Sequence, residues 1–153
     1  MKTLILTIAA TLLTFSTNAY SGNIDYISCG NSQGYSYYYD TGFVKDKSSA
    51  NVRIIVLGDG EFDIEYNYKG GAYKSAIKDD NAMVVNQGAI KSKDGKLVSL
   101  RIAILYHDRT DVLVLTTDGV TGEVKLVQTV AINNATTFQA SKVMVSDCTI
   151  VPK

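Results

Sequence analysis

Apolar and polar residues alternate along most of this 153-residue chain, in short runs separated by glycine, aspartate and asparagine turns. A period of two is typical of β-strands with one buried face, and no long segment has the 3.6-residue period of an amphipathic helix. The runs predict strands at Gln33–Asp40, Val52–Leu57, Glu61–Tyr68, Ala72–Lys78, Ala82–Ile90, Leu97–Tyr106, Asp111–Thr117, Glu123–Ile132 and Phe138–Cys148. The single proline, Pro152, lies beyond the last run, so it interrupts no strand.

Two tight turns allow the pairing around Glu61–Tyr68 to be predicted in register. A three-residue loop at residues 58–60 brings apolar side chains together on one face and opposite charges together on the other. The pairs predicted across this loop are Val56 with Phe62, Ile54 with Ile64 and Arg53 with Glu65. A two-residue Gly70-Gly71 turn, suited to a type I′ hairpin, predicts the pairs Tyr68 with Tyr73, Ile64 with Ile77 and Asp63 with Lys78.

Nearly all the predicted connections are short, which favours antiparallel pairing of consecutive strands over crossover connections. The predicted fold is therefore all-β, an antiparallel meander of about eight or nine strands. We expect a small closed barrel of lipocalin-like plan, because closure removes both edges of the sheet. A two-sheet β-sandwich is the alternative.

Two predicted strands are apolar on both faces. Leu97–Tyr106 carries Leu97, Ala103 and Leu105 opposite a fully apolar face, and residues 112–115 are apolar throughout. Strands of this kind are covered on both sides. We therefore expect the outer side to be covered by another element of the chain, by the second layer of a sandwich, or by another subunit or partner.

The N-terminal segment has the three parts of a secretory signal. Lys2 precedes an uncharged apolar run of about a dozen residues, Leu4 to Phe15, and small residues follow. That run is shorter than the roughly 20 residues that cross a bilayer. We expect residues 1–21 to be a cleaved signal peptide and residues 22–153 to form one exported domain, periplasmic or secreted, with no membrane span.

Export places cysteines in an oxidising compartment, where a pair becomes a structural disulfide. Cys29 and Cys148 are the only two cysteines, and they lie near opposite ends of the predicted domain. We expect them to form a disulfide that joins the first and last strands and fits closure of the barrel. A redox-active pair would need a Cys-x-x-Cys spacing, which is missing.

The sequence favours no enzymatic, metal or nucleic-acid function. Fifteen basic and fifteen acidic residues balance, which argues against nonspecific binding to nucleic acid or anionic lipid. His107 is the only histidine and no Gly-x-Ser-x-Gly motif is present, so we expect no catalytic residue, no metal site and no cofactor. Glu61, Asp63 and Glu65 share one strand face, which predicts a solvated row of salt bridges.

Ten tyrosines and no tryptophan make the composition unusual. Tyrosine offers a large contact area with little loss of side-chain entropy, and it is favoured at recognition surfaces. We predict a ligand-binding aromatic wall, inside or at the mouth of the barrel, formed by Tyr35, Tyr37, Tyr39, Tyr66, Tyr68 and Tyr73. The alternative is that these residues are ordinary strand formers at the edge of a small core.

Tyr26 shortly before Cys29, together with the late Cys148, resembles the plan of small exported bacterial barrels, including the lysozyme-inhibitor type. The likeness covers only the two ends of the chain. The Tyr-to-Cys spacing departs from the pattern of that family, so no functional residue is carried over from it.

Three functional hypotheses follow. The first is a non-enzymatic recognition module that binds an unknown protein or a small apolar ligand through its tyrosine-rich face or its loops. The second is a structural or assembly subunit, such as a homodimer, with the doubly apolar strands as its interface. The third, with least support, is an enzyme that depends on His107, which would then have to lie in a cleft. Asn134 begins a glycosylation pattern, which matters only in a eukaryotic secretory pathway.

Overall fold

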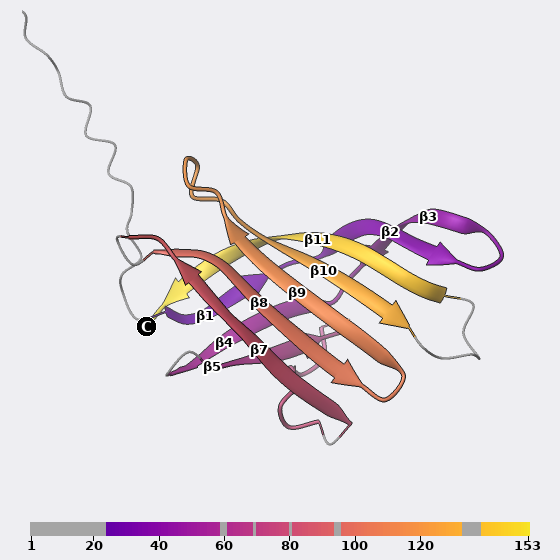
Figure 1. Ribbon diagram of the computed structural model, residues 1–153, viewed down its shortest axis with the longest axis horizontal. Coiled ribbons are helices and arrows are strands. Elements are labelled where there is room, and N and C mark those ends of the chain that lie inside the picture. Colours follow the sequence, from indigo (N-terminus) through magenta and orange to yellow (C-terminus); the bar gives the residue numbers. More distant parts are fainter. Residues whose placement is uncertain (1–23, 59–60, 69, 80, 94–95, 133–138) are drawn as a thin grey trace, which may run out of the picture.

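The computed structural model describes residues 24–58, 61–68, 70–79, 81–93, 96–132 and 139–153, and the side chains of all of these except residues 58, 86, 87, 139 and 140. Every regular element in these ranges is a β-strand, and every strand pair is antiparallel (Figure 1). The strands are β1 (Ile24–Cys29), β2 (Ser32–Tyr38), β3 (Gly42–Ser48), β4 (Asn51–Gly58), β5 (Glu61–Asn67), β6 (Lys74–Ser75), β7 (Ala82–Lys91), β8 (Leu97–Tyr106), β9 (Arg109–Thr117), β10 (Val124–Ile132) and β11 (Gln139–Pro152). The all-β antiparallel prediction is confirmed. The predicted signal peptide at residues 1–21 and the glycosylation pattern at Asn134 lie outside the described residues.

The first and last strands of the chain lie side by side. β1 pairs with the end of β11 and with β4, whereas β2 pairs with the start of β11 and with β3. The strand order is β6–β5–β4–β1–β11–β10–β9–β8–β7, with β2 and β3 beside the start of β11. The first and last strands of the chain are thus paired with each other, through β1 and β11. The two strands at the ends of the sheet are β6 and β7, and we call the opening between them the seam.

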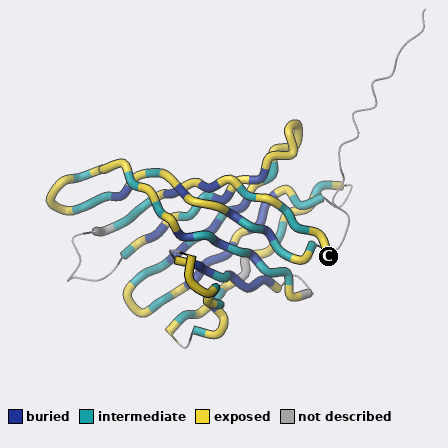
Figure 2. Tube along the Cα trace, turned by 180° about the vertical axis from the view of Figure 1, so that it is seen from behind, coloured by how far each residue is buried: buried dark blue, intermediate teal, exposed yellow. Residues whose placement is uncertain are grey.

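The sheet curls into a half-barrel (Figure 1). β5 approaches β7 across the seam, but no ladder joins β6 to β7 among the described residues. Buried positions alternate with exposed ones along the strands and meet in one interior (Figure 2). The largest fully buried apolar side chains are Ile27, Ile54, Ile64, Leu100, Ile102, Ile104, Leu113, Leu115, Leu126 and Met144. The barrel-like fold expected from the sequence is therefore present with an open seam.

One of the two predicted registers is confirmed and the other is wrong by one residue. In the β4–β5 hairpin, Ile54 faces Ile64 and Arg53 faces Glu65, as predicted. In the β5–β6 hairpin, however, the pairs are Glu65 with Ser75 and Tyr66 with Lys74. The connection is longer than a two-residue turn because Asn67 Nδ2 donates a hydrogen bond of 2.6 Å to the carbonyl of Gly71.

The shifted register buries Asp63, which was predicted to belong to a solvated row. The pairing with β5 continues in the same register just beyond β6, where Ala76 N donates to the carbonyl of Ile64 at 2.7 Å. Ser75 Oγ and Ile77 N then donate to the Asp63 carboxylate at 2.6 and 3.2 Å. A buried carboxylate needs such partners, and the prediction that Asp63 pairs with Lys78 on a solvated face is wrong.

β1 and β3 were not predicted from the sequence. β1 is short and adjoins the expected signal segment. β3 pairs with β2 alone, so it is an edge strand and most of its residues are exposed. Its three successive charged residues, Lys45, Asp46 and Lys47, suit that position. Charged residues of this kind protect an edge strand from pairing with other chains.

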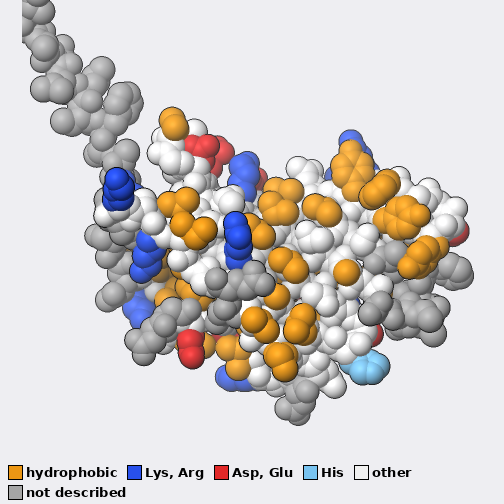
Figure 3. All heavy atoms as spheres, in the orientation of Figure 1, with side chains coloured by type: hydrophobic (Ala, Val, Ile, Leu, Met, Phe, Trp, Pro, Cys, Tyr) orange, Lys and Arg blue, Asp and Glu red, His pale blue; other side chains and the backbone are white. Residues whose placement is uncertain are grey.

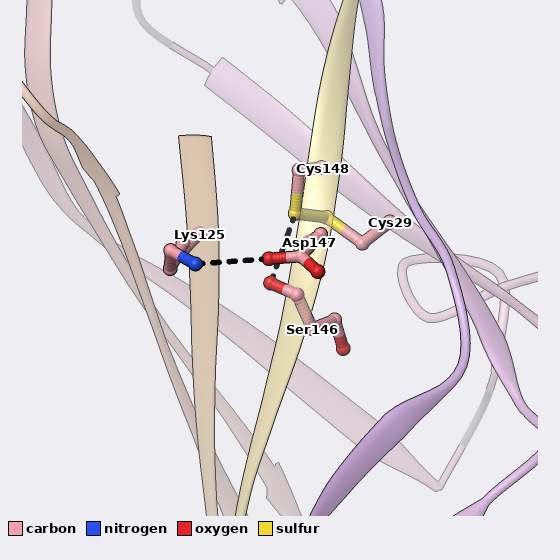
Figure 4. Close-up of a disulfide and its surroundings, with 5 residues drawn as sticks. All are labelled: Cys29, Lys125, Ser146, Asp147 and Cys148. Atoms are coloured by element: carbon pink, nitrogen blue, oxygen red, sulfur yellow. Dashed lines mark hydrogen bonds and ion pairs between the residues drawn. A yellow bond between two sulfur atoms is a disulfide. The ribbon is translucent and has the colours of Figure 1, made fainter. Parts of the chain in front are cut away.

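The disulfide joins β1 to β11 directly (Figure 4). Cys29 and Cys148 occupy facing positions of the β1–β11 ladder, with Cα atoms 4.1 Å apart, and they are separated by 119 residues in sequence. Cys29 is fully buried beside Ile27. The predicted disulfide is confirmed, and it indicates an oxidising compartment.

Removing the disulfide should destabilise the fold strongly. In the chain-entropy model, a cross-link that closes a loop of 119 residues stabilises the protein by about 5 kcal/mol. We expect Cys29→Ala with Cys148→Ala to lower the free energy of unfolding in urea by about that amount. A reducing agent should produce the same loss in the wild type and none in the double variant; an unchanged midpoint for the variant would contradict the expectation.

Gly34 is expected to be essential for the pairing of β2 with β11. A Cβ atom at this position would collide with the backbone carbonyl of Val143 and the Cα of Met144, whereas one at Gly119 would meet nothing within 4 Å. Gly34→Ala should therefore lower the free energy of unfolding by about 3 kcal/mol or more. Gly119→Ala is the matched control and should change it by less than about 0.5 kcal/mol. Equal effects of the two substitutions in urea denaturation would refute this account of Gly34.

Candidate functional site

The outer face of the sheet, between β2 and β7, carries three rows of residues that face one another across the strands. In the order β2, β11, β10, β9, β8 and β7, the first row is Tyr37, Ser141, Ala131, Thr110, Leu105 and Met83; the second is Tyr35, Val143, Thr129, Val112, Ala103 and Val85; the third is Gln33, Val145, Val127, Val114 and, on β8, Arg101. We call these residues the outer face. β8 and β9 carry apolar residues on both sides because one side of each strand belongs to the outer face and the other side fills the core.

No described element of the chain covers the outer face (Figures 1 and 3). Figure 3 shows apolar side chains spread across it. The largest exposed members are Tyr35, Met83, Val85, Leu105, Val143 and Val145. At the strand spacing of about 4.8 Å, with same-face residues about 6.8 Å apart, the three rows cover roughly 500 Å². Patches of that size on a monomer are often functional.

An aromatic cluster extends the outer face along the β2–β3 hairpin. We define the aromatic hairpin as Tyr35, Tyr37, Tyr39 and Phe43. The ring of Tyr37 lies 6.1 Å from that of Tyr39 and 5.1 Å from that of Phe43, both in edge-to-face geometry. Tyr39 is 71% exposed and Phe43 is 77% exposed. Tyr37, Tyr39 and Phe43 pack against one another, and the β2–β3 ladder fixes the backbone that carries Tyr35, Tyr37 and Phe43.

The structure separates the six tyrosines that were predicted to form one wall. Tyr35, Tyr37 and Tyr39 belong to the aromatic hairpin on the outside. The other three lie on the β5–β6 hairpin, whose strands pair with β4 and with each other and not with β2. Phe43, which completes the aromatic hairpin, was missed because its strand is too charged to be recognised from its pattern.

The second trio is itself divided. Tyr66 is buried, and its ring stacks with that of Tyr68 at 6.2 Å. Tyr73 instead packs against Arg53, whose guanidinium carbon lies 3.8 Å from the centre of the Tyr73 ring and 5.0 Å from that of Tyr26. Such cation–π contacts favour a structural role for Tyr73.

Tyr66 belongs to a polar cluster, which we call the interior cluster, with Tyr106, Arg109, Asp111 and Gln128. Asp111 is 2% exposed, and its carboxylate lies 3.4 Å from Arg109 Nε and accepts a hydrogen bond of 3.3 Å from Gln128 Nε2. The Arg109 guanidinium lies 4.3 Å from the centre of the Tyr106 ring. The cluster therefore links β8, β9 and β10 to β5, across the side of the barrel that no ladder closes.

Burial dominates the electrostatics of the interior cluster. It raises the pKa of Asp111, although Arg109 and Lys142 act in the opposite direction. It also raises the pKa of Tyr66 well above its usual value, with the charge of Asp111 as the next cause. The geometry leaves the Tyr66 hydroxyl and Asp111 Oδ1 buried without a well-aligned hydrogen bond. A phenol that stays neutral beside a buried carboxylate suits a role in orienting the side chains of the cluster.

The remaining sequence candidates lie outside the outer face and the interior cluster. His107 is exposed at the turn between β8 and β9, whereas the enzymatic hypothesis places it in a cleft. Within the described residues, no three histidine, cysteine or acidic side chains gather where they could hold a metal ion. The same residues include no helix with the length and hydropathy to span a membrane.

A polar hollow adjoins the outer face. It has a volume of about 560 Å³ and lies where β1 gives way to β2 and β3 to β4. Its lining is Asn31, Ser32, Gln33, Lys47, Ser48, Ser49, Lys125, Val145 and Asp147. Gln33 and Val145 also belong to the third row, so the hollow continues the outer face toward the disulfide.

Asp111 should make the protein less stable as the pH rises. Because burial raises its pKa in the folded protein, the folded state binds a proton more readily than the unfolded state between pH 3.8, the ordinary value, and the raised value. Across that window the free energy of unfolding falls with increasing pH. Asp111→Asn removes this dependence, so the stability of the variant relative to the wild type should rise with pH in urea denaturation.

Asp118 provides a control of opposite sign. Hydrogen bonds from the backbone of Thr121 and Val120 lower the pKa of this exposed carboxyl. Its stabilisation is present above its unfolded pKa and is lost as the pH falls. The stability of Asp118→Asn relative to the wild type should therefore decrease as the pH rises; the same sign for both variants would contradict the assignment.

Comparisons with known proteins complete the description of these sites. No family model matches the sequence, and no curated protein and no solved structure matches the chain. What the protein does therefore has to be inferred from the chemistry of its own outer face, aromatic hairpin and interior.

Proposed function

We propose that the protein is an exported, non-enzymatic recognition module that binds a partner protein through the aromatic hairpin and the adjoining outer face. The observation that carries this proposal is the exposure of Tyr39 and Phe43, which both pack against Tyr37, together with the exposed Tyr35 on the same face, beside an uncovered apolar sheet. Export is supported by the signal-like N-terminus and by the disulfide.

The composition of the hairpin suits protein recognition. Residues 35–43 contain tyrosine, serine, glycine, aspartate, threonine and phenylalanine, a mixture similar to that of antibody binding loops. Each aromatic side chain supplies a large area with only two rotatable bonds, and the β2–β3 ladder fixes the backbone that carries them. Little conformational entropy is therefore lost on binding.

A partner protein fits the site better than a small apolar ligand does. Small molecules are held in concave pockets that bury most of their surface, whereas the aromatic hairpin and the outer face lie on the outside of a curled sheet. Their combined area exceeds roughly 500 Å², and a standard protein interface takes about 800 Å² from each partner. The hollow beside Lys47 is lined mainly by polar side chains, which does not suit an apolar ligand.

The test is to remove the exposed rings while the fold is kept. Tyr39→Ser with Phe43→Ser removes two side chains that are largely in solvent, and Val120→Ser is the matched control because Val120 is 93% exposed on the β9–β10 turn. We expect native mass spectrometry of protein purified gently from its own compartment to find a second protein bound to the wild type and to Val120→Ser. The double variant should lose it at least tenfold, as hot-spot residues do.

Two results would overturn the proposal. One is a wild-type protein that carries no other protein under these conditions. The other is a complex that survives the loss of both rings. A retained small molecule with no protein would support the ligand hypothesis in its place.

A further inference from the structure

We infer that the partner protein has a contact surface that is apolar at its centre and acidic at two opposite margins. This inference rests on the proposed function and specifies the chemistry of the partner. It follows from where the outer face carries charge, which cations are already paired, and how the sheet is curved.

The outer face is uncharged from β2 to β9; its cations lie on β3, beside β2, and on β8, where Arg101 ends the third row next to Gly88 of β7. From β2 to β9, the three rows contain no charged side chain. On β3, Lys45 lies opposite Tyr35 and Lys47 lies opposite Gln33. On β8, Arg101 lies opposite Val114 of β9. All three cations are exposed, so each margin presents positive charge to solvent.

The acidic residue between the two lysines does not neutralise them. Asp46 faces Gly34 on the opposite side of the hairpin, where its carboxylate accepts a hydrogen bond of 2.6 Å from Ser36 Oγ. Its other oxygen accepts from the backbone N of Lys47 at 2.7 Å. β3 therefore presents cations alone toward the outer face.

Lys125, in contrast to these three cations, is paired with two carboxylates. Its ammonium lies 3.1 Å from Asp147 (Figure 4) and 3.7 Å from Glu123. Within the described part of the chain, no ion pair of this kind is found for Lys45, Lys47 or Arg101. Like charges facing an interface cost affinity, and opposite charges guide association, so the partner should bring carboxylates to these margins.

The hollow beside β3 gives one of these carboxylates a place to bind. Its lining includes the ammonium-bearing side chain of Lys47, the hydroxyl residues Ser48 and Ser49 and the amide residue Asn31. It also includes Asp147, whose carboxylate is paired with Lys125 at 3.1 Å. A carboxylate is recognised by cations and by hydroxyl or amide donors. An acidic side chain of the partner could therefore enter the hollow while the neighbouring apolar residues cover Val145.

The positions of these cations also argue against a second copy of the chain and against a membrane as the binding partner. A second copy would bring the same three cations to the interface, and Asp147 and Glu123 already pair with Lys125. A flat anionic membrane would have to reach both margins across five strand intervals, about 24 Å, on the outside of a curled sheet. A protein surface can curve over both margins, so a partner protein is the occupant to which we commit.

The experiment combines site-specific cross-linking with charge reversal in the cells that make the protein. A photoreactive phenylalanine derivative replaces Val143, at the centre of the outer face. The test variant adds Lys45→Glu, Lys47→Glu and Arg101→Glu. The charge-matched control adds Lys74→Glu, Lys78→Glu and Lys153→Glu, which are exposed and lie outside the three rows. Urea denaturation of each purified variant checks that it is folded.

We expect the parent protein and the control to form an adduct with one other protein, and the test variant to form at least tenfold less. Mass spectrometry should locate the cross-link in an apolar segment of that protein flanked by aspartate or glutamate. An adduct that persists in the test variant but disappears with Tyr39→Ser and Phe43→Ser would overturn the acidic margins while the proposed function stands.

Three further results would overturn the inference together with the docking mode. An adduct of twice the chain mass would identify a second copy. A lipid adduct would identify a membrane. The absence of any adduct in the folded parent protein would refute the proposed function itself.

Discussion

The fold depends on the pairing of β1 and β2 with β11. The end of β11 holds β1, its start holds β2, and its other edge holds β10. The disulfide fastens this junction from within, because Cys29 and Cys148 face each other in the ladder and the Cys29 side chain is fully buried. Without the junction, the β7–β10 wall and the β4–β5 wall would share no strand, and the interior between them would be open on two sides.

Because the first and last strands of the chain pair with each other, the two unpaired edges of the sheet belong to strands from the middle of the chain, β6 and β7. The interior cluster lies beside the seam between them, where Tyr66 from β5 meets Arg109 and Asp111 from β9. A buried carboxylate near an arginine is weak evidence for stability. Its value here is specific orientation, because polar partners allow fewer packing arrangements than apolar side chains do. The outer face carries no such constraint, and its apolar residues are in excess of what the core needs.

Much of the fold follows from the sequence because strand alternation is a local property. The β4–β5 register was predictable, since only one loop length puts Ile54 against Ile64 and Arg53 against Glu65. The β5–β6 register was not, because a side chain, Asn67, binds the loop and lengthens it. β3 was missed because it is a charged edge, and charged segments resemble loops in sequence.

The candidate site was only partly predictable for a similar reason. The sequence identified Tyr35, Tyr37 and Tyr39 as one face of a strand, and the structure places them in one exposed cluster with Phe43. It could not show that Tyr66, Tyr68 and Tyr73 belong elsewhere, because that depends on which strands become neighbours. The doubly apolar pattern of β8 and β9 predicted a second covered side, and the uncovered outer face is its structural counterpart.

The adjacency of the two ends of the domain also determines when the chain can fold. β11 is synthesised after every other described strand, yet β1, β2 and β10 all need it as a neighbour. Contacts between residues more than a hundred positions apart make folding slow, because loop closure precedes the energy gained from pairing. A growing chain can pair β4 with β5 and β7 through β10 with one another, but it cannot complete the sheet until its last described strand has been synthesised.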